Sequence, residues 1–313
     1  MRKLESNEIL VIAGPTASGK SRLALDLAAS IPLEIISADS MQVYRGMDIG
    51  TDKPSREEQE RVAHHLIDVK DPDQEWSVEE FVRLAQCAIR SIKARGRVPC
   101  IVGGTGFYMR ALLRDYPLED APPDWEFRRR MQGFAKEHGN EALHNKLLDK
   151  DPVSWKNLHP QDQKRVIRAL EYYEATGKPI SSRVGATKTR APRYQAAILG
   201  LWWERQELYQ RIDYRVERQF KRGLVEEVKY LLDQGYSQDL PSMQGLCYKE
   251  TCNYLAGFST LDETKNLIMR NTRRLAKRQF TWFSREEGIN WVRAGKDRSW
   301  DSIVKEAKEA AGY

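Results

Sequence analysis

Short apolar runs recur along this chain, and most of them end in glycine or small polar residues. The runs lie at 9–13, 33–37, 98–102 and 196–201. Runs of this length with such boundaries are typical of buried strands. Between them, apolar residues at helical spacing predict helices, and in the helix expected over 77–94, Ser77 and Glu80 have the spacing of a capping box. Strands that alternate with helices predict an α/β fold with a parallel sheet.

A different kind of sequence separates the third of these runs from the fourth. Its landmarks are prolines at 117, 122 and 123, highly charged helices over 126–138 and 162–175, and a loop at 185–192. We therefore expect a helical insertion domain at 116–196 with its own small core. Residues 1–115 and 197–313 would form the α/β body.

The later part of the body carries concentrated positive charge. A helix expected over 207–220 has Arg211 and Arg215 on one face, four residues apart. Between Arg270 and Arg285 there are six Lys or Arg residues and no Asp or Glu. The positions that would form one stripe on a helix here are Arg270, Arg274, Lys277 and Arg278. A merely solvated face is one explanation, and a phosphate backbone lying along the stripe is the better one.

The composition narrows the class of protein. The 313 residues are 41% hydrophobic and 31% charged, with a net charge of +6, as in a soluble globular protein with a mildly basic surface. No apolar run approaches the roughly 18 residues that a membrane helix needs, so we expect a cytoplasmic protein with no membrane partner. The four cysteines are scattered, which favours core or incidental thiols over a zinc site or a disulfide framework.

A glycine-rich loop follows the first apolar run and precedes an amphipathic segment. It reads Gly14-Pro15-Thr16-Ala17-Ser18-Gly19-Lys20-Ser21, the G-x-x-x-x-G-K-S pattern of a P-loop. Successive backbone N–H groups of such a loop surround an anion, and the dipole of the next helix adds partial positive charge. Lys20 would reach the outer phosphate, and the Ser21 hydroxyl would ligate Mg²⁺. The pattern predicts a P-loop NTPase-like parallel sheet and leaves the phosphate compound open.

Two further groups of residues come at the ends of predicted strands. Asp39 follows the second run, where it either faces the phosphate site or caps the next turn, and the polar loop at 44–51 favours the former. Gly103, Gly104 and Thr105 follow the third run, where backbone would approach a ligand closely. An enzyme that hydrolyses ATP is expected to carry a magnesium-binding aspartate at that strand end. Its absence from the sequence there argues against ordinary ATP hydrolysis.

Taken together, these residues identify a family: the chain resembles the tRNA dimethylallyltransferases, also called tRNA isopentenyltransferases, over nearly its whole length. The matching segments are 14–21, 37–44, 46–51, 102–106 with Tyr108, Arg211-Ile212 with Arg215, 248–250, and 272–279 with Thr281 and Trp282. The resemblance implies transfer of a dimethylallyl group from dimethylallyl pyrophosphate to N6 of the adenosine immediately 3′ of the anticodon, position 37, in tRNAs that read codons beginning with U. The anion in the P-loop would then be the leaving pyrophosphate, with no nucleotide hydrolysed.

The resemblance also implies roles for individual residues. Asp39 would accept a proton or a hydrogen bond from the adenine amine, and Thr105 would help to expel the leaving group. Lys20, Arg215, the loop at 14–21 and Mg²⁺ would stabilise the departing pyrophosphate.

A tRNA-binding surface is implied as well. Asp39, Ser40, Met41 and Gln42 would receive the flipped adenine. The remaining expected contacts to the anticodon stem-loop are Lys164, Arg165, Val166, Ile167 and Arg168, then Gln244, Gly245 and Lys249, then Arg273, Arg274, Lys277, Arg278 and Gln279. The helical insertion would clasp the stem-loop, and we expect the enzyme to be a monomer.

Two positions depart from the family pattern. Cys247 stands where glycine is usual, and Gln219 stands where methionine is common. Because cysteine lacks glycine's freedom, the turn at Cys247 is not expected to rely on positive φ.

Two rival functions share part of the pattern. A small-molecule or nucleoside kinase would share the P-loop and the α/β body, but the missing strand-end aspartate and the basic segment at 270–285 count against it. A non-catalytic RNA-binding protein with a relic P-loop is disfavoured by Asp39 and Thr105 at strand ends.

Overall fold

The computed structural model describes residues 8–114, 123–182 and 192–313. The prolines at 117 and 122, and all but the last residue of the loop expected at 185–192, lie outside the described residues. The chain divides into two compact units, residues 1–113 with 194–313 and residues 114–193.

One boundary of the expected insertion is corrected by the secondary structure. Residues 195 and 196, which the sequence pattern places in the insertion, begin strand β5 (Gln195–Trp203) of the first unit. Glu8 and Ile9 of the first strand pair with them, so these two residues are held by the sheet.

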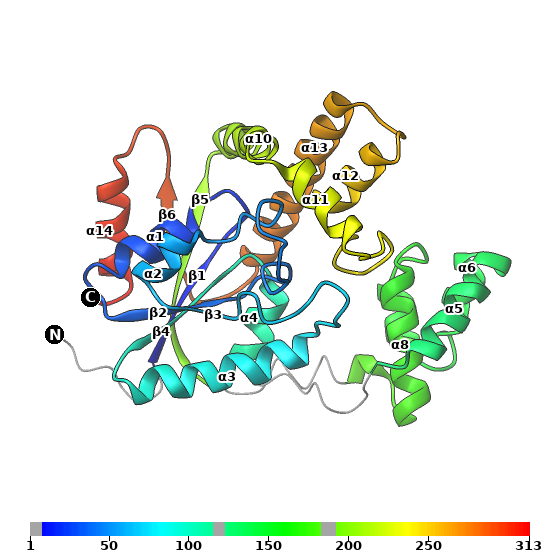
Figure 1. Cartoon of the computed structure of the whole chain (residues 1–313). Helices are drawn as coiled ribbons and strands as arrows, with labels where there is room; N and C mark the ends of the chain where they lie inside the picture. Colours follow the sequence, from blue (N-terminus) through cyan, green and yellow to red (C-terminus); the bar gives the residue numbers. More distant parts are fainter. Residues whose placement is uncertain (1–7, 115–122, 183–191) are drawn as a thin grey trace. The chain divides into compact units, whose positions relative to one another are not determined.

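A six-stranded parallel sheet forms the centre of the first unit, which confirms the α/β prediction (Figure 1). Its strands, in their order across the sheet, are β3 (His64–His65), β2 (Leu33–Ser37), β4 (Val98–Gly103), β1 (Glu8–Ala13), β5 and β6 (Ile289–Ala294). In the register, Ala13 lies beside Gly103, and Val102 lies beside Ser37. Strands β1, β2 and β4 therefore end at one edge of the sheet, where the P-loop and Asp39 follow.

Alternate residues of the central strands fill two cores, one on each face of the sheet. In β1, Leu10 and Ile12 belong to one core, and Ile9, Val11 and Ala13 belong to the other. The helices of this unit are α1 (Lys20–Leu27), α2 (Arg56–Arg61), α3 (Val78–Ala94), α4 (Gly106–Leu113), α10 (Arg205–Lys221), α11 (Leu224–Asp233), α12 (Tyr248–Leu255), α13 (Leu261–Phe283) and α14 (Trp300–Ala310). Helices α1 and α14 cover the first face, and α3 and α4 cover the second (Figure 1).

A third core joins helices α10 to α13 to the loop that follows β2. Val43 and Met47 of that loop are fully buried against side chains such as Val216 of α10 and Tyr248 of α12. This packing fixes the polar loop at the edge of the sheet.

No membrane-spanning helix is found in the part of the chain that the structure describes.

The start of α3 shows half of the expected capping box. The Ser77 hydroxyl accepts the N–H of Glu80 at 3.1 Å, as the pattern predicts. The Glu80 carboxylate pairs instead with Lys70, at 2.8 Å. The helix therefore begins where expected, with one of the two reciprocal bonds replaced by an ion pair.

The second unit is a small helical bundle. Its described helices are α5 (Trp125–His138), α6 (Asn140–Asn145), α7 (Pro152–Asn157) and α8 (Gln163–Thr176). Val166 and Ile167 are buried in its core, so their side chains are not available to tRNA in this structure, and the expected contact of this segment stays a prediction. Arg168 and Arg128 both pair with the buried carboxylate of Glu171, so Arg168 has a structural partner. Of the cations expected to contact RNA from this helix, Lys164 and Arg165 remain exposed.

Candidate active site

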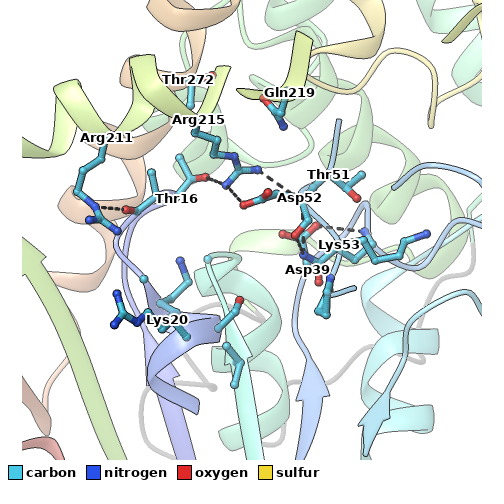
Figure 2. A pocket seen from close by; sticks show the side chains of 18 of the residues that line it. Thr16, Lys20, Asp39, Thr51, Asp52, Lys53, Arg211, Arg215, Gln219 and Thr272 are labelled. Carbon is cyan, nitrogen blue, oxygen red and sulfur yellow. Dashed lines mark hydrogen bonds and ion pairs between the residues drawn. The ribbon is translucent and has the colours of Figure 1, made fainter. Parts of the chain in front are cut away.

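A cavity of about 1140 Å³ opens at the edge of the sheet where β1, β2 and β4 end. Its walls come from the P-loop, the end of β2, the loop that leads to α2, and helices α10 and α13. Figure 2 shows Lys20, Asp39 and Arg215 converging on this space from three different elements. The structure thus brings together three of the four residues expected to be catalytic.

The P-loop is held in a conformation that depends on glycine. Gly14 has a φ of 144°, and a Cβ at this position would lie 2.8 Å from the carbonyl oxygen of Leu201. Gly19, which precedes α1, has a φ of 96°. These two glycines allow the chain to turn from β1 into α1 close to the neighbouring strand.

Three carbonyl oxygens of the loop are hydrogen-bonded inside the protein. Lys20 Nζ donates to the Pro15 carbonyl at 2.7 Å. Arg211 Nε donates to that of Ala17, and Trp203 Nε1 to that of Ser18, each at 2.8 Å. With these acceptors occupied, the N–H groups are the loop's means of binding an anion. The N–H groups of Thr16 and Ser18 are exceptions, because Thr16 donates to Gln279 Oε1 at 2.8 Å and Ser18 donates to the Pro15 carbonyl at 3.3 Å.

Lys20 is the group whose charge the site controls. Its pKa is lowered to about 7, chiefly by burial and also by the nearby Arg215 guanidinium, while the Asp39 carboxylate acts in the opposite direction. The ammonium is therefore expensive in the absence of an anion and would be stabilised by one. A lysine prepared in this way is typical of a phosphate or pyrophosphate site.

Arg215 connects the P-loop to a carboxylate that we did not select from the sequence. Its Nη1 lies 3.0 Å from Thr16 Oγ1 and 3.5 Å from Asp52 Oδ2 (Figure 2). Arg218 and Arg222 also approach Asp52, at 2.8 and 3.9 Å. The spacing of these arginines along α10 marks one helix face and could have been recognised in the sequence; the position of Asp52 could not.

Asp39 both faces the cavity and caps the next turn, which we treated as alternatives in the sequence analysis. It lines the cavity next to the end of β2. Its Oδ1 also accepts the backbone N–H of Met41 at 2.8 Å and that of Gln42 at 3.4 Å, so it caps the following turn. The turn cap fixes the direction of the carboxylate, which is useful for a group that must meet a base.

Thr105 and Gln279 lie differently from what we expected. Thr105 follows Gly104, which lines the cavity, but Thr105 is not itself among the lining residues. Gln279 is expected to bind tRNA, yet its amide joins Thr16 to Gly104, donating to the Gly104 carbonyl at 3.1 Å. In this structure Gln279 therefore supports the P-loop.

The segment expected to receive the adenine is partly tied to its neighbours. Gln42 accepts from the Ser37 hydroxyl at 2.9 Å, and its amide nitrogen lies 3.4 Å from the carbonyl oxygens of Thr51 and Asp52. Met41 meets Gly245 so closely that a Cβ there would lie 2.3 Å from the methionine methyl group. Ser40 is partly exposed, and Gln244 and Lys249 are exposed.

The basic stripe of α13 is confirmed as an exposed surface. Arg270, Arg274, Lys277 and Arg278 are exposed, and in the described part of the chain none of them has an ion-pair partner. Arg273 differs, since its guanidinium pairs with Asp213 of α10. Four cations without carboxylate partners form a surface suited to a phosphate backbone.

The two unusual residues, Cys247 and Gln219, meet each other beside the cavity. Cys247 has a φ of 78°, so the turn keeps positive φ without a glycine, contrary to our expectation. Its buried thiol, whose pKa is raised by burial to about 12, lies 3.9 Å from Gln219 Oε1. The Gln219 amide nitrogen donates to the carbonyls of Ile49 and Gly50 at 2.9 and 3.0 Å. These contacts help to hold the loop that carries Asp52.

A parallel sheet, a P-loop with a titratable lysine, and a strand-end aspartate in the same cavity define an α/β enzyme that handles a phosphate or pyrophosphate anion. Two family models match the chain: IPP transferase over residues 42–286 and isopentenyl transferase over residues 7–74.

Comparison with known proteins indicates the same family over nearly the whole chain. A tRNA dimethylallyltransferase of Acetivibrio thermocellus is 45% identical over 302 residues, which is 96% of each chain. The crystal structure of the tRNA isopentenylpyrophosphate transferase of Bacillus halodurans is 40% identical, covers 98% of this chain and 99% of that one, and has a TM-score of 0.71. A eukaryotic dimethylallyltransferase, whose structures were described as acting on tRNA, is 29% identical, with a TM-score of 0.78 over 96% of this chain and 77% of that one. The chain belongs to the IPP transferase family, the tRNA dimethylallyltransferases.

Proposed function

We propose that this enzyme transfers a dimethylallyl group from dimethylallyl pyrophosphate to N6 of the adenosine at tRNA position 37, in tRNAs that read codons beginning with U, and releases pyrophosphate. Membership of the family supports the transferase class and the tRNA substrate. The observation that carries the proposal is one cavity that holds both an anion cradle and a carboxylate that can meet an amine.

The adenine amine is a weak nucleophile because its lone pair is delocalised into the ring. Asp39 would accept a hydrogen bond from this amine and take its proton as the bond from nitrogen to the allylic carbon forms. The bond from that carbon to the pyrophosphate oxygen breaks at the same time. Because Asp39 is already fixed by the Met41 N–H, the carboxylate is oriented before the base arrives.

The leaving group gains negative charge as the carbon–oxygen bond breaks. Lys20, Arg215 and the N–H groups of the P-loop would stabilise that charge. Positive charge on the allylic carbon is greatest at the same moment, so this stabilisation acts mainly on the transition state. Thr105 remains a proposed contributor to leaving-group expulsion, by family resemblance.

We propose Mg²⁺ as the metal ion of this reaction. The Ser21 hydroxyl lies on the first turn of α1 and lines the cavity. Mg²⁺ usually keeps several waters and binds substrate phosphate oxygens, so one protein hydroxyl would be enough to help place it. Mg²⁺ bound by Ser21 and the pyrophosphate oxygens would add positive charge opposite the leaving group.

The target adenine must leave its stack to reach the cavity, at a cost of roughly a few kcal/mol. The exposed stripe on α13 would bind the phosphate backbone and offset that cost. Lys164 and Arg165 of the second unit, and Gln244 and Lys249 near α12, are further proposed contacts. We propose that the enzyme acts on tRNA as a cytoplasmic monomer.

A transfer assay tests the proposal. The enzyme is incubated with radiolabelled dimethylallyl pyrophosphate, Mg²⁺ and unmodified tRNA, with no ATP present. We expect label in a prenylated adenosine at position 37 and stoichiometric release of pyrophosphate. Consumption of added ATP without transfer of the prenyl group would support the kinase alternative instead.

A further inference from the structure

One carboxylate stands among three arginines at the mouth of the anion cradle. Asp52 lies 2.8 Å from Arg218, 3.5 Å from Arg215 and 3.9 Å from Arg222. Arg215 and Arg218 belong to α10, and Arg222 caps its C-terminal end. Figure 2 shows the pair of Arg215 and Asp52. The Asp52 side chain is 28% exposed and lines the same cavity as the P-loop. One negative charge cannot balance three guanidinium groups, so the cluster remains able to attract an anion.

The loop around Asp52 is held by hydrogen bonds from two helices, α10 through Gln219 and α11 through Glu227. The Glu227 carboxylate of α11 accepts the backbone N–H groups of Asp48, Ile49 and Gly50, at 2.7 to 3.1 Å. Asp52 itself has a φ of 53°, a conformation that aspartate tolerates better than most residues. The carboxylate is therefore placed at this position by the loop, rather than drawn there by a flexible side chain alone.

The guanidinium of Arg215 serves two sites at once. It donates to Thr16 of the P-loop at 3.0 Å and pairs with Asp52 at 3.5 Å. A pyrophosphate in the cradle would approach the same guanidinium and would meet the negative charge of Asp52 beside it. The two anions compete for one cation, and like charges this close repel each other.

We propose that Asp52 is an internal counter-anion that limits the affinity of the cradle for pyrophosphate and so favours release of this product. The inference rests on the proposed function, which makes pyrophosphate the leaving group. A cradle with Lys20, Arg215 and the loop N–H groups alone would hold a multiply charged product tightly. When the site is empty, Asp52 partly neutralises the arginines around it. As pyrophosphate leaves, Asp52 takes its place as their partner.

The test is binding of inorganic pyrophosphate with Mg²⁺ to the full-length protein, measured by calorimetry at low ionic strength. Asp52→Asn is the informative variant, because asparagine also tolerates positive φ and keeps the shape of the side chain. Removal of one charge beside a multiply charged anion is expected to tighten binding by about tenfold. The inhibition constant of pyrophosphate in the transfer assay should fall by the same factor, and added salt should shrink the difference.

Asp71→Asn is the matched control for net charge. Asp71 is 43% exposed and pairs with Arg45 at 2.9 Å on the surface, so its loss should leave pyrophosphate affinity unchanged. Damage to the loop by Asp52→Asn would not tighten binding, and an unchanged melting temperature would confirm that the fold is intact.

The outcomes separate this inference from the proposed function. Weaker or equal binding in Asp52→Asn, with normal binding in the wild type, would overturn the counter-anion role alone. Weaker binding would indicate instead that Asp52 positions Arg215. No binding of pyrophosphate to the wild type would overturn both.

Discussion

The charge on Lys20 should make pyrophosphate binding depend on pH in a predictable direction. Its pKa in the empty site is about 7, against an ordinary value of 10.5, and an anion in the cradle would raise it again. The difference of 3.5 units, at about 1.36 kcal/mol each, corresponds to about 5 kcal/mol of attraction that a bound anion can recover. Affinity should therefore be fully present below pH 7 and be lost as the pH rises above it.

The magnitude follows from the fraction of charged lysine. At pH 8 about one empty molecule in ten carries the ammonium, so binding should take up about 0.9 protons, and affinity should fall about tenfold for each further pH unit. Calorimetry in two buffers with different ionisation enthalpies measures this uptake directly. Phosphate buffer is avoided because it would occupy the cradle.

The ligand also binds protons in this range, so the control must remove only the lysine's contribution. Lys20→Arg keeps a positive charge that does not titrate below pH 12. Its proton uptake reports the pyrophosphate alone, and the difference from the wild type reports Lys20. Identical uptake and identical pH dependence in the two proteins would refute the reasoning.

Three further predictions concern binding and stability. Arg274→Ala should weaken tRNA binding and reduce the slope of log affinity against log salt by about one, whereas an unchanged slope would make the α13 stripe an ordinary surface. Glu34 is buried beside Arg95, which holds the pKa of the carboxyl at about 2. Glu34→Ala should therefore cost about 3 kcal/mol of unfolding free energy at pH 7 in urea, and a deficit that did not shrink between pH 4.5 and 2 would contradict this. Cys247→Gly should be more stable than Cys247→Ala by about 1 kcal/mol in the same assay, because only glycine relieves the positive φ; equal stability would show that the turn is not strained.

The sheet and the P-loop could be predicted because each depends on residues close together in the chain. A buried parallel strand needs a short apolar run, and an anion cradle needs glycines at fixed spacing. The parallel order then places the strand ends together, so the proximity of Lys20 and Asp39 follows from local pattern plus one rule of topology.

The environment of the site depends on contacts that are distant in sequence. Glu227 bonds the backbone of Asp48, 179 residues away, and Asp52 meets Arg218, 166 residues away. No local pattern encodes such pairs. The same limitation applies to Arg273. In the sequence it cannot be told apart from its neighbour Arg274, but in the structure it pairs with Asp213 on α10.

The burial of Val166 and Ile167 could have been predicted from the sequence. An apolar pair inside a charged helix, with Leu170 one turn later, marks the buried face of that helix. The family segment suggested contact with RNA as a whole, but the helical period separates its exposed cations from its core. Periodicity should therefore decide which members of a matched segment can touch a ligand.

The role of Asp39 is the central claim, and the transfer rate of Asp39→Asn in a single turnover tests it most directly. Asparagine retains an oxygen for the Met41 N–H and so preserves the turn, but it cannot accept the proton of the amine. With tRNA and dimethylallyl pyrophosphate prebound at saturating concentrations, we predict a rate lower by at least about 100-fold, with tRNA affinity nearly unchanged. A transfer rate close to that of the wild type would contradict the assignment of Asp39 as the base.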